Sequence, residues 1–488
     1  MENKTSVIRK MHDMLVKKEM SCKEITAKYL DEIKKSELNA YVKVCEDTAF
    51  STANAVDKKI SQGEEISMLE GIPMTLKDNM STKGIETTCC SKILKGYEPI
   101  YDATVWSTLK SQNAVLLGKA NMDEFAMGSS CENSCFGGAA NPHNLKHVAG
   151  GSSGGVAAAV GGNIAAYGLG SDTGGSIRQP ASFCGIVGLK PTYGSVSRYG
   201  LVAYASSLDQ IGPIASTVED VSLVYDAIAG YDSKDSTSSK LAPKNTFDFL
   251  NKDIKGMKIG IAKEYFEGIG GEIKEAIDKA ISTFEEMGAE VESFSLSELK
   301  YALPVYYIIA CAEASSNLGR YDGIRYGHKT DSYKDINEMI CKTRSEGFGE
   351  EVKRRILLGN YVLSSGYYDA YYKKAQKLRG AIVKGFKNAY KKYDAILAPT
   401  VPSTAFEFNF TSADPVQTYL TDICTVPVNI AGLPALSLPC GFDSKNLPIG
   451  MQLIGDSFSE SKILNIANQF EKYTQGKFLK QVDMGVKI

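Results

Sequence analysis

The chain has 488 residues, of which 43% are hydrophobic and 23% are charged, as in an ordinary globular protein. Its formal net charge is -2, so overall charge gives no reason to expect binding to nucleic acid or to a membrane surface. No stretch reaches the roughly 18 apolar residues of a membrane-spanning helix, and the polar start does not resemble a signal peptide. Eleven scattered cysteines indicate free thiols in a reducing compartment, and we therefore expect a cytoplasmic protein.

The N-terminal segment, residues 1–68, is predicted to be helical. Ser21 and Glu24 have the spacing of a capping box, in which each side chain bonds the other's backbone N–H. Ile25, Tyr29 and Ile33 then recur at helical spacing. A helix is therefore expected to begin just after Ser21.

Residues 69–216 differ in composition from the rest of the chain. Glycine, alanine and serine dominate, charges become rare, and apolar runs such as 156–160 appear. This composition is typical of a tightly packed interior with close backbone approaches. Segments 71–76 and 114–118 are predicted to be short buried strands, and we expect 69–216 to form the catalytic core.

The second half of the chain alternates between strand and helix patterns. A polar stretch at 231–251 is predicted to be a surface loop. The segment 257–294 then predicts a strand, a helix ending at Gly288 and a second strand. This order favours an α/β sheet.

Residues 303–393 are predicted to be mostly helical and to cover the substrate. Strands are expected at 395–398 and 435–438, and a helix at 461–473. The interval 367–392 combines lysines with tyrosines, which could contact RNA by charge and stacking. A solvated helical face with its tyrosines turned inward is the more common arrangement, and we favour it.

Three segments carry residues suited to catalysis, namely 75–79, 150–155 and 170–178. The last two are glycine-rich and contain Ser152 and Ser176. A serine flanked by glycines can expose its hydroxyl while neighbouring N–H groups converge on one point, as an oxyanion hole requires. The pattern therefore indicates a serine nucleophile, although glycine-rich stretches are more often simple turns.

These segments resemble the signature of the amidase signature family, in which a lysine and two serines replace Ser-His-Asp. Lys77 lies 75 residues before Ser152, which lies 24 residues before Ser176, as in that family. The resemblance implies one amidase domain over 1–488, with a central mixed β-sheet covered by helices on both faces. It also implies that Ser176 is the nucleophile, that Ser152 links it to Lys77, and that the Gly151–Ser152 peptide is cis.

The same resemblance assigns supporting roles. The N–H groups around Thr173, Gly174 and Gly175 are expected to form the oxyanion hole. We also expect Asp172 and Arg178 to pair beside the nucleophile. Lys77 must be neutral to accept a proton, which requires desolvation because its reference pKa is about 10.4. The carboxylate of Asp78 should not stabilise the charged form of Lys77, because consecutive side chains on a strand point to opposite faces.

Further segments resemble the glutamine-hydrolysing A subunits of tRNA-dependent amidotransferases within this family. The residues concerned lie at 121–128, 197–210, 345–356 and 364–372. The resemblance implies that ammonia from glutamine is used to convert Glu-tRNA(Gln) to Gln-tRNA(Gln). It also implies a heterotrimer, in which a B subunit holds the tRNA, ATP and Mg and a small C subunit clamps A to B. No metal or cofactor is expected in this chain.

A free amino acid needs both of its charges bound. Arg355 could pair with the carboxylate of glutamine, Asp422 could meet the ammonium, and Tyr307 could line the pocket. The alternatives are that Arg355 and Asp422 are surface ions and that Tyr307 belongs to the core.

Other functions fit single motifs of the chain less well. Residues 151–155 fit the G-x-S-x-G elbow of α/β-hydrolases, but only His328 follows to complete a triad. Cys131, Cys135, His143 and His147 suggest zinc, although free cysteines and surface histidines fit the short spacing better. A stand-alone amidase acting on another small or fatty amide would keep the lysine and both serines, whereas a non-catalytic scaffold would not need them.

Overall fold

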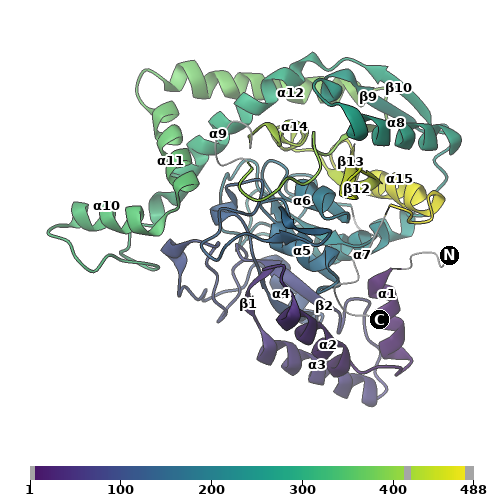
Figure 1. Cartoon of the computed structure of the whole chain (residues 1–488), viewed down its shortest axis with the longest axis horizontal. Helices are drawn as coiled ribbons and strands as arrows, with labels where there is room; N and C mark the ends of the chain where they lie inside the picture. Colours follow the sequence, from purple (N-terminus) through teal and green to yellow (C-terminus); the bar gives the residue numbers. More distant parts are fainter. Residues whose placement is uncertain (1–5, 244, 411–418, 479–488) are drawn as a thin grey trace.

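The computed structural model describes residues 6–243, 245–410 and 419–478. Its centre is a mixed sheet of eleven strands in the order β1-β3-β2-β6-β8-β7-β12-β13-β11-β9-β10 (Figure 1). The strands of this sheet are β1 (Tyr41–Val44), β2 (Pro73–Lys77), β3 (Val115–Ala120), β6 (Tyr167–Asp172), β7 (Val187–Lys190), β8 (Gln210–Ala215), β9 (Lys258–Ala262), β10 (Glu290–Phe294), β11 (Ala395–Pro399), β12 (Ala435–Phe442) and β13 (Pro448–Ile454). Helices flank the sheet, so the predicted α/β fold is confirmed.

The predicted strands at 71–76 and 114–118 are confirmed as β2 and β3, which pair in parallel. β2 also pairs in parallel with β6, and every residue of the three strands is buried. Parallel strands buried on both faces read as continuous apolar runs, as these two segments do. Lys77 lies at the carboxyl end of β2, where the sheet opens toward the site.

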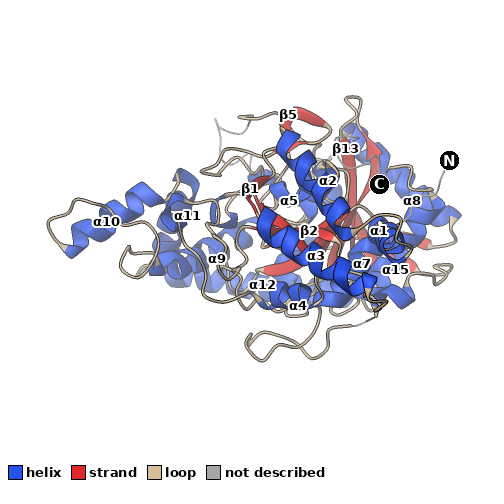
Figure 2. Cartoon of the chain, turned by 90° about the horizontal axis from the view of Figure 1, so that it is seen from below, coloured by secondary structure: helices blue, strands red, loops and turns tan. Residues whose placement is uncertain are grey.

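The N-terminal segment contains α1 (Val7–Val16), α2 (Cys22–Lys35) and α3 (Glu46–Ser61). α2 and α3 pack on each other and on β3, whereas α1 lies beside α7 (Figure 2). The capping box at the start of α2 is confirmed in both directions. The first five residues lie outside the described part of the chain. The short strand β1 between α2 and α3 was not predicted, because it takes its place from antiparallel pairing with β3.

The half of the chain that holds the predicted catalytic core, residues 6–243 and called the catalytic half below, continues with α4 (Thr104–Ser111), α5 (Gly154–Gly161), α6 (Arg178–Phe183) and α7 (Val218–Ile228). The apolar run at 156–160 belongs to α5, whose eight residues are all buried. A helix without a polar face must lie in the interior of a protein. α5 therefore fixes the preceding turn, which carries Ser152, deep inside the molecule.

The predicted strand–helix–strand unit is confirmed as β9, α8 (Gly271–Glu286) and β10. The region 303–393 is mostly helical, as predicted, and α10 projects from the body beyond α11 (Figures 1 and 2). Its helices are α9 (Ala302–Asn317), α10 (Ile336–Gly347), α11 (Glu350–Leu363) and α12 (Lys373–Ala389). The last predicted helix is α15 (Glu460–Tyr473). The division of the chain into segments at 68, 216, 303 and 393 stays a prediction.

One expectation about the surface was wrong for three of the five tyrosines in 367–392. Tyr367, Tyr368 and Tyr371 do not turn inward, since each is about two-fifths exposed. They lie at the π-helical turn Tyr368–Tyr372 between α11 and α12, and Tyr361 packs on Tyr367 with ring centroids 4.3 Å apart. The predicted loop at 231–251 is largely at the surface. Among the described residues, no helix has the length and apolar character needed to cross a bilayer.

The close packing of α5 makes a testable prediction. A Cβ atom at Gly155 would lie 2.4 Å from the carbonyl oxygen and 2.5 Å from the nitrogen of Asn121, which are backbone atoms. We expect Gly155→Ala to lower the free energy of unfolding by about 1–3 kcal/mol through overpacking, measured by chemical denaturation. Gly380→Ala on α12 is the matched control, because nothing lies within 4 Å of its added Cβ. That change should stabilise the protein by about 0.5–1 kcal/mol, and equal effects at both glycines would contradict the packing argument.

Candidate active site

The amine of Lys77 is buried at the end of β2, with no exposed side-chain surface. Its Nζ lies 2.7 Å from Oγ of Ser152 and 3.0 Å from Oγ of Ser171, with which it makes hydrogen bonds. The structure thus brings together two members of the predicted triad that are 75 residues apart in sequence. The amine is within proton-transfer distance of the Ser152 hydroxyl.

The surroundings of Lys77 favour its neutral form. Burial lowers the pKa of Lys77 to about 8, while the charges of Asp123, Asp172 and Asp209 act in the opposite direction. Desolvation dominates because, among the described residues, the amine has no carboxylate in direct contact and bonds hydroxyl and carbonyl oxygens. A substantial fraction of Lys77 is therefore neutral in mildly alkaline solution.

Asp78 points away from Lys77, as predicted. Its carboxylate accepts hydrogen bonds from the backbone N–H and the hydroxyl of Thr88 and lies 3.3 Å from Nζ of Lys119. Both members of this ion pair are buried. Lys119, a second buried lysine, thus pairs with Asp78, so Asp78 does not stabilise the protonated form of Lys77.

Ser152 lies in the turn that precedes α5. The Gly151–Ser152 peptide is cis, as the resemblance implied. A Cβ at Gly151 would lie 2.0 Å from Oδ2 of Asp123, so this position requires glycine. The N–H of Gly151 donates to the side chain of Gln179 at 2.8 Å. These contacts fix Ser152, whose side chain is fully buried, beside Lys77.

Ser176 follows a turn that two distant segments hold in place. A Cβ at Gly174 would lie 2.5 Å from the ring of Tyr306, and one at Gly175 would lie 2.3 Å from Oγ1 of Thr425. Gly175 also has φ +138°, which only glycine adopts readily. The carbonyl of Ser176 accepts a bond from Ser153 N–H at 3.1 Å, which ties the two serine turns together.

The predicted pair of Asp172 and Arg178 is present and fully buried. The guanidinium donates to both carboxylate oxygens, at 3.1 and 3.2 Å. Burial would raise the pKa of Asp172, but the charge of Arg178 overcomes this effect and lowers it to about 2. Arg178 also donates to Asn429 at 2.6 Å and to Gln452 at 2.9 Å. The pair therefore joins the nucleophile turn to the C-terminal part of the chain.

The three predicted oxyanion-hole residues line this turn. The N–H of Gly175 donates to Oδ1 of Asp172 at 2.8 Å, and this bond occupies one of the three predicted donors. The hydroxyl of Thr173 donates to Asp209 at 2.6 Å and so orients its peptide. The role of Thr173, Gly174 and Gly175 in binding an oxyanion stays a prediction.

The three predicted substrate-binding residues meet in one place, although they come from α9, α11 and the segment before α14 (Val426–Ala431). The hydroxyl of Tyr307 donates to Oδ2 of Asp422 at 2.9 Å, and the guanidinium of Arg355 lies 5.3 Å from the Tyr307 ring centroid. Arg355 and Asp422 are only 3% and 7% exposed, so neither is a surface ion. Burial raises the pKa of Asp422 to about 6, which still leaves it ionised near neutral pH.

Arg355 is held in a fixed orientation by its own neighbours. Its Nε donates to Glu351 at 2.7 Å and its Nη1 to the hydroxyl of Tyr204 at 2.6 Å. Its guanidinium also lies 5.5 Å from the ring centroid of Tyr419. An arginine held in this way can present its remaining N–H groups to a carboxylate without further ordering.

Several neighbours of the site were not assigned from sequence. Asn79 donates to Ser171 at 2.9 Å, and Ser171 in turn bonds Lys77. Ser129 donates to Asp422 at 2.8 Å. Asn79 and Ser171 lie inside the motif segments and could have been singled out as polar residues beside Lys77. The contact of Ser129 with Asp422 spans 293 residues and has no local signal.

The rival interpretations do not fit these contacts. Ser153, at the centre of the G-x-S-x-G pattern, donates to the carbonyl of Ser171, and His328 lies beside Glu346, 2.8 Å away. His147 is buried, so the expectation of a surface histidine was wrong at this position. Over residues 6–243, 245–410 and 419–478, no group of three or more His, Cys, Asp or Glu side chains is arranged to hold a metal ion.

Comparison with known proteins gives the family. A sequence model described as Amidase matches residues 24–464. The chain is 54% identical to the A subunit of glutamyl-tRNA(Gln) amidotransferase from Heliobacterium modesticaldum over 99% of each chain. It is 55% identical to the protein of the same name from Caldanaerobacter subterraneus over 97% of each chain.

Solved structures agree with this assignment. The crystal structure of the glutamyl-tRNA(Gln) amidotransferase A subunit from Thermotoga maritima matches at a TM-score of 0.79 and 42% identity, with 95% of each chain covered. A bacterial aryl acylamidase of the amidase signature family matches at a TM-score of 0.84 and 25% identity, over 99% of each chain. The chain therefore belongs to the amidase family, among its glutamyl-tRNA(Gln) amidotransferase A subunits.

Proposed function

We propose that this chain hydrolyses glutamine through an acyl-enzyme on Ser176 and supplies the ammonia to a partner protein that converts Glu-tRNA(Gln) to Gln-tRNA(Gln). The observation that carries the proposal is the buried Lys77 amine, 2.7 Å from the hydroxyl of Ser152. This arrangement suits amide hydrolysis without histidine or metal. The relatives named as A subunits of glutamyl-tRNA(Gln) amidotransferase support glutamine as the substrate.

In the proposed mechanism, neutral Lys77 accepts a proton from Ser152 while Ser152 accepts the proton of Ser176. The Ser176 oxygen attacks the side-chain carbonyl of glutamine, and the N–H groups of Thr173 and Gly174, which remain after Gly175 bonds Asp172, stabilise the oxyanion. The proton returns through Ser152 to the leaving nitrogen, so ammonia departs and a glutamyl ester remains. Water then attacks this ester by the same relay and releases glutamate.

Binding of glutamine falls to the residues between α9, α11 and α14. Arg355 would hold the α-carboxylate and Asp422 the ammonium, while Tyr307 lines the pocket and fixes Asp422. Both charged side chains are buried, so each ion would meet its partner out of bulk water, where pairing is strong. In this proposal the region 303–393 covers the substrate, because it supplies Tyr307 and Arg355.

The rest of the reaction is assigned to partners. A B subunit would hold the tRNA and activate it with ATP and Mg, and a small C subunit would clamp A to B in a heterotrimer in the cytoplasm. The net charge of -2 fits a protein that leaves the tRNA to its partner. Asp172 and Arg178 would keep the nucleophile turn rigid during the reaction.

The proposal is tested with the purified chain, alone and mixed with the candidate B and C subunits. We expect weak glutaminase activity alone and a strong rise when both partners are present, because assembly completes an ammonia-consuming site. Ammonia and glutamate are measured directly, and amidation is followed on Glu-tRNA(Gln). Robust partner-free hydrolysis of unrelated small or fatty amides, with none on glutamine, would instead favour a stand-alone amidase.

The nucleophile is tested by covalent labelling with an activated glutamine analogue. The Ser176→Ala chain should take up no label, because no other hydroxyl is expected to form the ester. Mass spectrometry of the intact chain measures the adduct. Ser182→Ala, which also lies in the catalytic half but outside the triad, is the control and should label like the unmodified chain. Full labelling of Ser176→Ala would refute the assignment.

The role of Lys77 as the base predicts how kcat/KM depends on pH. Because only neutral Lys77 can accept a proton, kcat/KM should rise with pH and level off above the Lys77 pKa of about 8. Lys77→Arg keeps a charged side chain and should lose about 10²–10⁴-fold in kcat at every pH. Initial rates across this interval give the profile. A rate independent of pH on both sides of 8 would show that Lys77 is not the titrating base.

A further inference from the structure

The segment 123–126 lies between the turn that carries Ser152 and the start of α11. On its catalytic side, the N–H of Asp123 donates to the carbonyl of Ser152 at 3.3 Å. The Asp123 carboxylate accepts the N–H of Cys131 at 2.9 Å and fills the space that a Cβ at Gly151 would need. This end of the segment is therefore packed directly against the cis peptide before Ser152.

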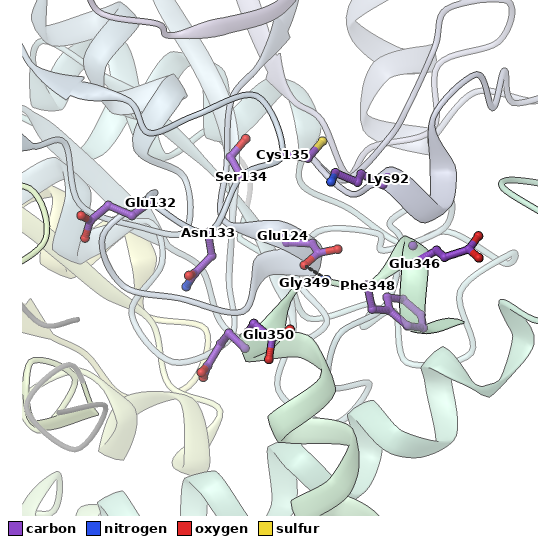
Figure 3. Close-up of a pocket in the computed structure, with 12 residues that line it drawn as sticks. Lys92, Glu124, Glu132, Asn133, Ser134, Cys135, Glu346, Phe348, Gly349 and Glu350 are labelled. Atoms are coloured by element: carbon purple, nitrogen blue, oxygen red, sulfur yellow. Dashed lines mark hydrogen bonds between the residues drawn. The ribbon is translucent and has the colours of Figure 1, made fainter. Parts of the chain in front are cut away.

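On its other side, the segment holds the N-terminus of α11 through Glu124. The N–H of Gly349, the residue before α11, donates to Oε2 of Glu124 at 2.8 Å (Figure 3). The hydroxyl of Ser91 donates to the other carboxylate oxygen and also lies 3.2 Å from the carbonyl of Gly347. A carboxylate at this position bonds an N–H group that has no partner within the helix, and it lies at the positive end of the helix dipole.

The space at Gly349 is shaped for this carboxylate. A Cβ added there would lie 2.4 Å from Oε2 of Glu124. Since Gly349 has φ -72°, its backbone would accept any residue, and only the Glu124 carboxyl group stands where a Cβ would lie. The contact with Glu124 therefore accounts for glycine at this position.

The backbone of the same segment is strained, and aromatic packing holds it in place. Phe125 and Ala126 have φ of +49° and +61°, a left-handed conformation that non-glycine residues rarely adopt. Such residues persist only where their surroundings hold them. Here the ring of Phe125 packs on Tyr321 and Phe348, with centroids 5.1 and 5.7 Å apart. Phe348 directly precedes Gly349, so the adjacent residues Glu124 and Phe125 both contact the same end of α11.

The environment of Glu124 contains acids as well as bases. It borders a cavity of about 330 Å³, which Lys92, Glu132, Glu346 and Glu350 also line (Figure 3). Burial raises the pKa of Glu124 to about 7, and its bonds to Ser91 and Gly349 and the charges of Lys353 and Lys92 oppose this rise. Among the described contacts of Glu124, none is an ion pair. Its carboxylate is therefore held by the Ser91 and Gly349 donors.

The position of α11 matters because this helix carries both Glu351 and Arg355 on the side of the pocket. A helix moves as a rigid body, so a displacement of its N-terminus displaces Arg355 as well. The loop after the 123–126 segment carries Ser129, which bonds Asp422. The positions of both proposed charge-binding residues, Arg355 and Asp422, thus depend on contacts with the segment that contacts Ser152.

We propose that Glu124 is a positioning residue for glutamine hydrolysis: by holding the N-terminus of α11 against the segment behind Ser152, it sets Arg355 at the distance from Ser176 that glutamine requires. This inference rests on the proposed function. Glu124 does not touch the reacting atoms and acts through Arg355. Its loss should weaken glutamine binding and leave the nucleophile intact.

The test compares Glu124→Ala and Gly349→Ala in the assembly with the partner subunits. The second variant keeps the carboxylate but expels it from its place. We expect each to raise KM for glutamine roughly tenfold, which corresponds to about 1.4 kcal/mol, with kcat within about twofold. The rate at which a fluorophosphonate labels Ser176 should not change, because this reagent does not need Arg355. Glu350→Ala is the matched control, an exposed acid at the same helix end that should leave KM unchanged.

Two further variants separate positioning from a merely structural role. Glu124→Gln retains an oxygen for the N–H of Gly349 and should restore most of the affinity for glutamine. The double variant Glu124→Ala/Gly349→Ala should have the KM of either single variant, because both break one contact. If Glu124→Ala does not fold, Gly349→Ala and Glu124→Gln still give the comparison.

The possible failures are distinct. An active wild type with unchanged KM in both single variants would overturn this inference alone. So would equal losses in KM, kcat and labelling rate, which would show a general disturbance of the fold. A wild-type assembly that does not hydrolyse glutamine would overturn the proposed function and this inference with it.

Discussion

Burial of the Lys77 amine, with no carboxylate in direct contact in the described part of the chain, is the constraint on which the rest of this structure depends. Lys77 is useful as a base only if it can lose its proton near neutral pH, and removal from water is what makes that possible. Removal from water demands a tight interior around the end of β2. The all-buried helix α5 and the ion pair that Asp78 makes with Lys119 both meet this demand. The glycine-rich composition of the catalytic half follows from it.

The second half of the chain completes this interior. Arg178 is fully buried and bonds Asp172, Asn429 and Gln452, so residues more than 250 positions away hold the nucleophile turn. Tyr306 and Thr425 close on Gly174 and Gly175 from two other elements. Two of the three predicted substrate-binding residues, Tyr307 and Asp422, come from these same parts of the chain, so the turn and the predicted pocket share contacts. Catalysis and recognition are therefore coupled by packing.

Local patterns predicted what depends on local physics. The capping box of α2, the buried strands β2 and β3 and the β9–α8–β10 unit each follow from residues within one element. β6 was missed because its sequence, Tyr-Gly-Leu-Gly-Ser-Asp, has weak strand preference, and it is a strand because β2 and β8 pair on both sides. Likewise, Glu124 meets Gly349 across 225 residues, and no periodicity reports such a contact. The predicted triad rests on a family resemblance in motif and spacing, because the residues alone left simple turns as an alternative.

The strand order of the sheet bears on how the protein is made. β7, from the first half, has β8 on one side and β12 on the other, and β12 in turn pairs with β13, which supplies Gln452 to Arg178. During synthesis on the ribosome, the nucleophile turn lacks these partners until nearly the whole polypeptide has emerged. A nascent or prematurely terminated chain would carry the lysine and both serines without the scaffold that aligns them. Late completion of the sheet would thus leave unfinished chains without an aligned site.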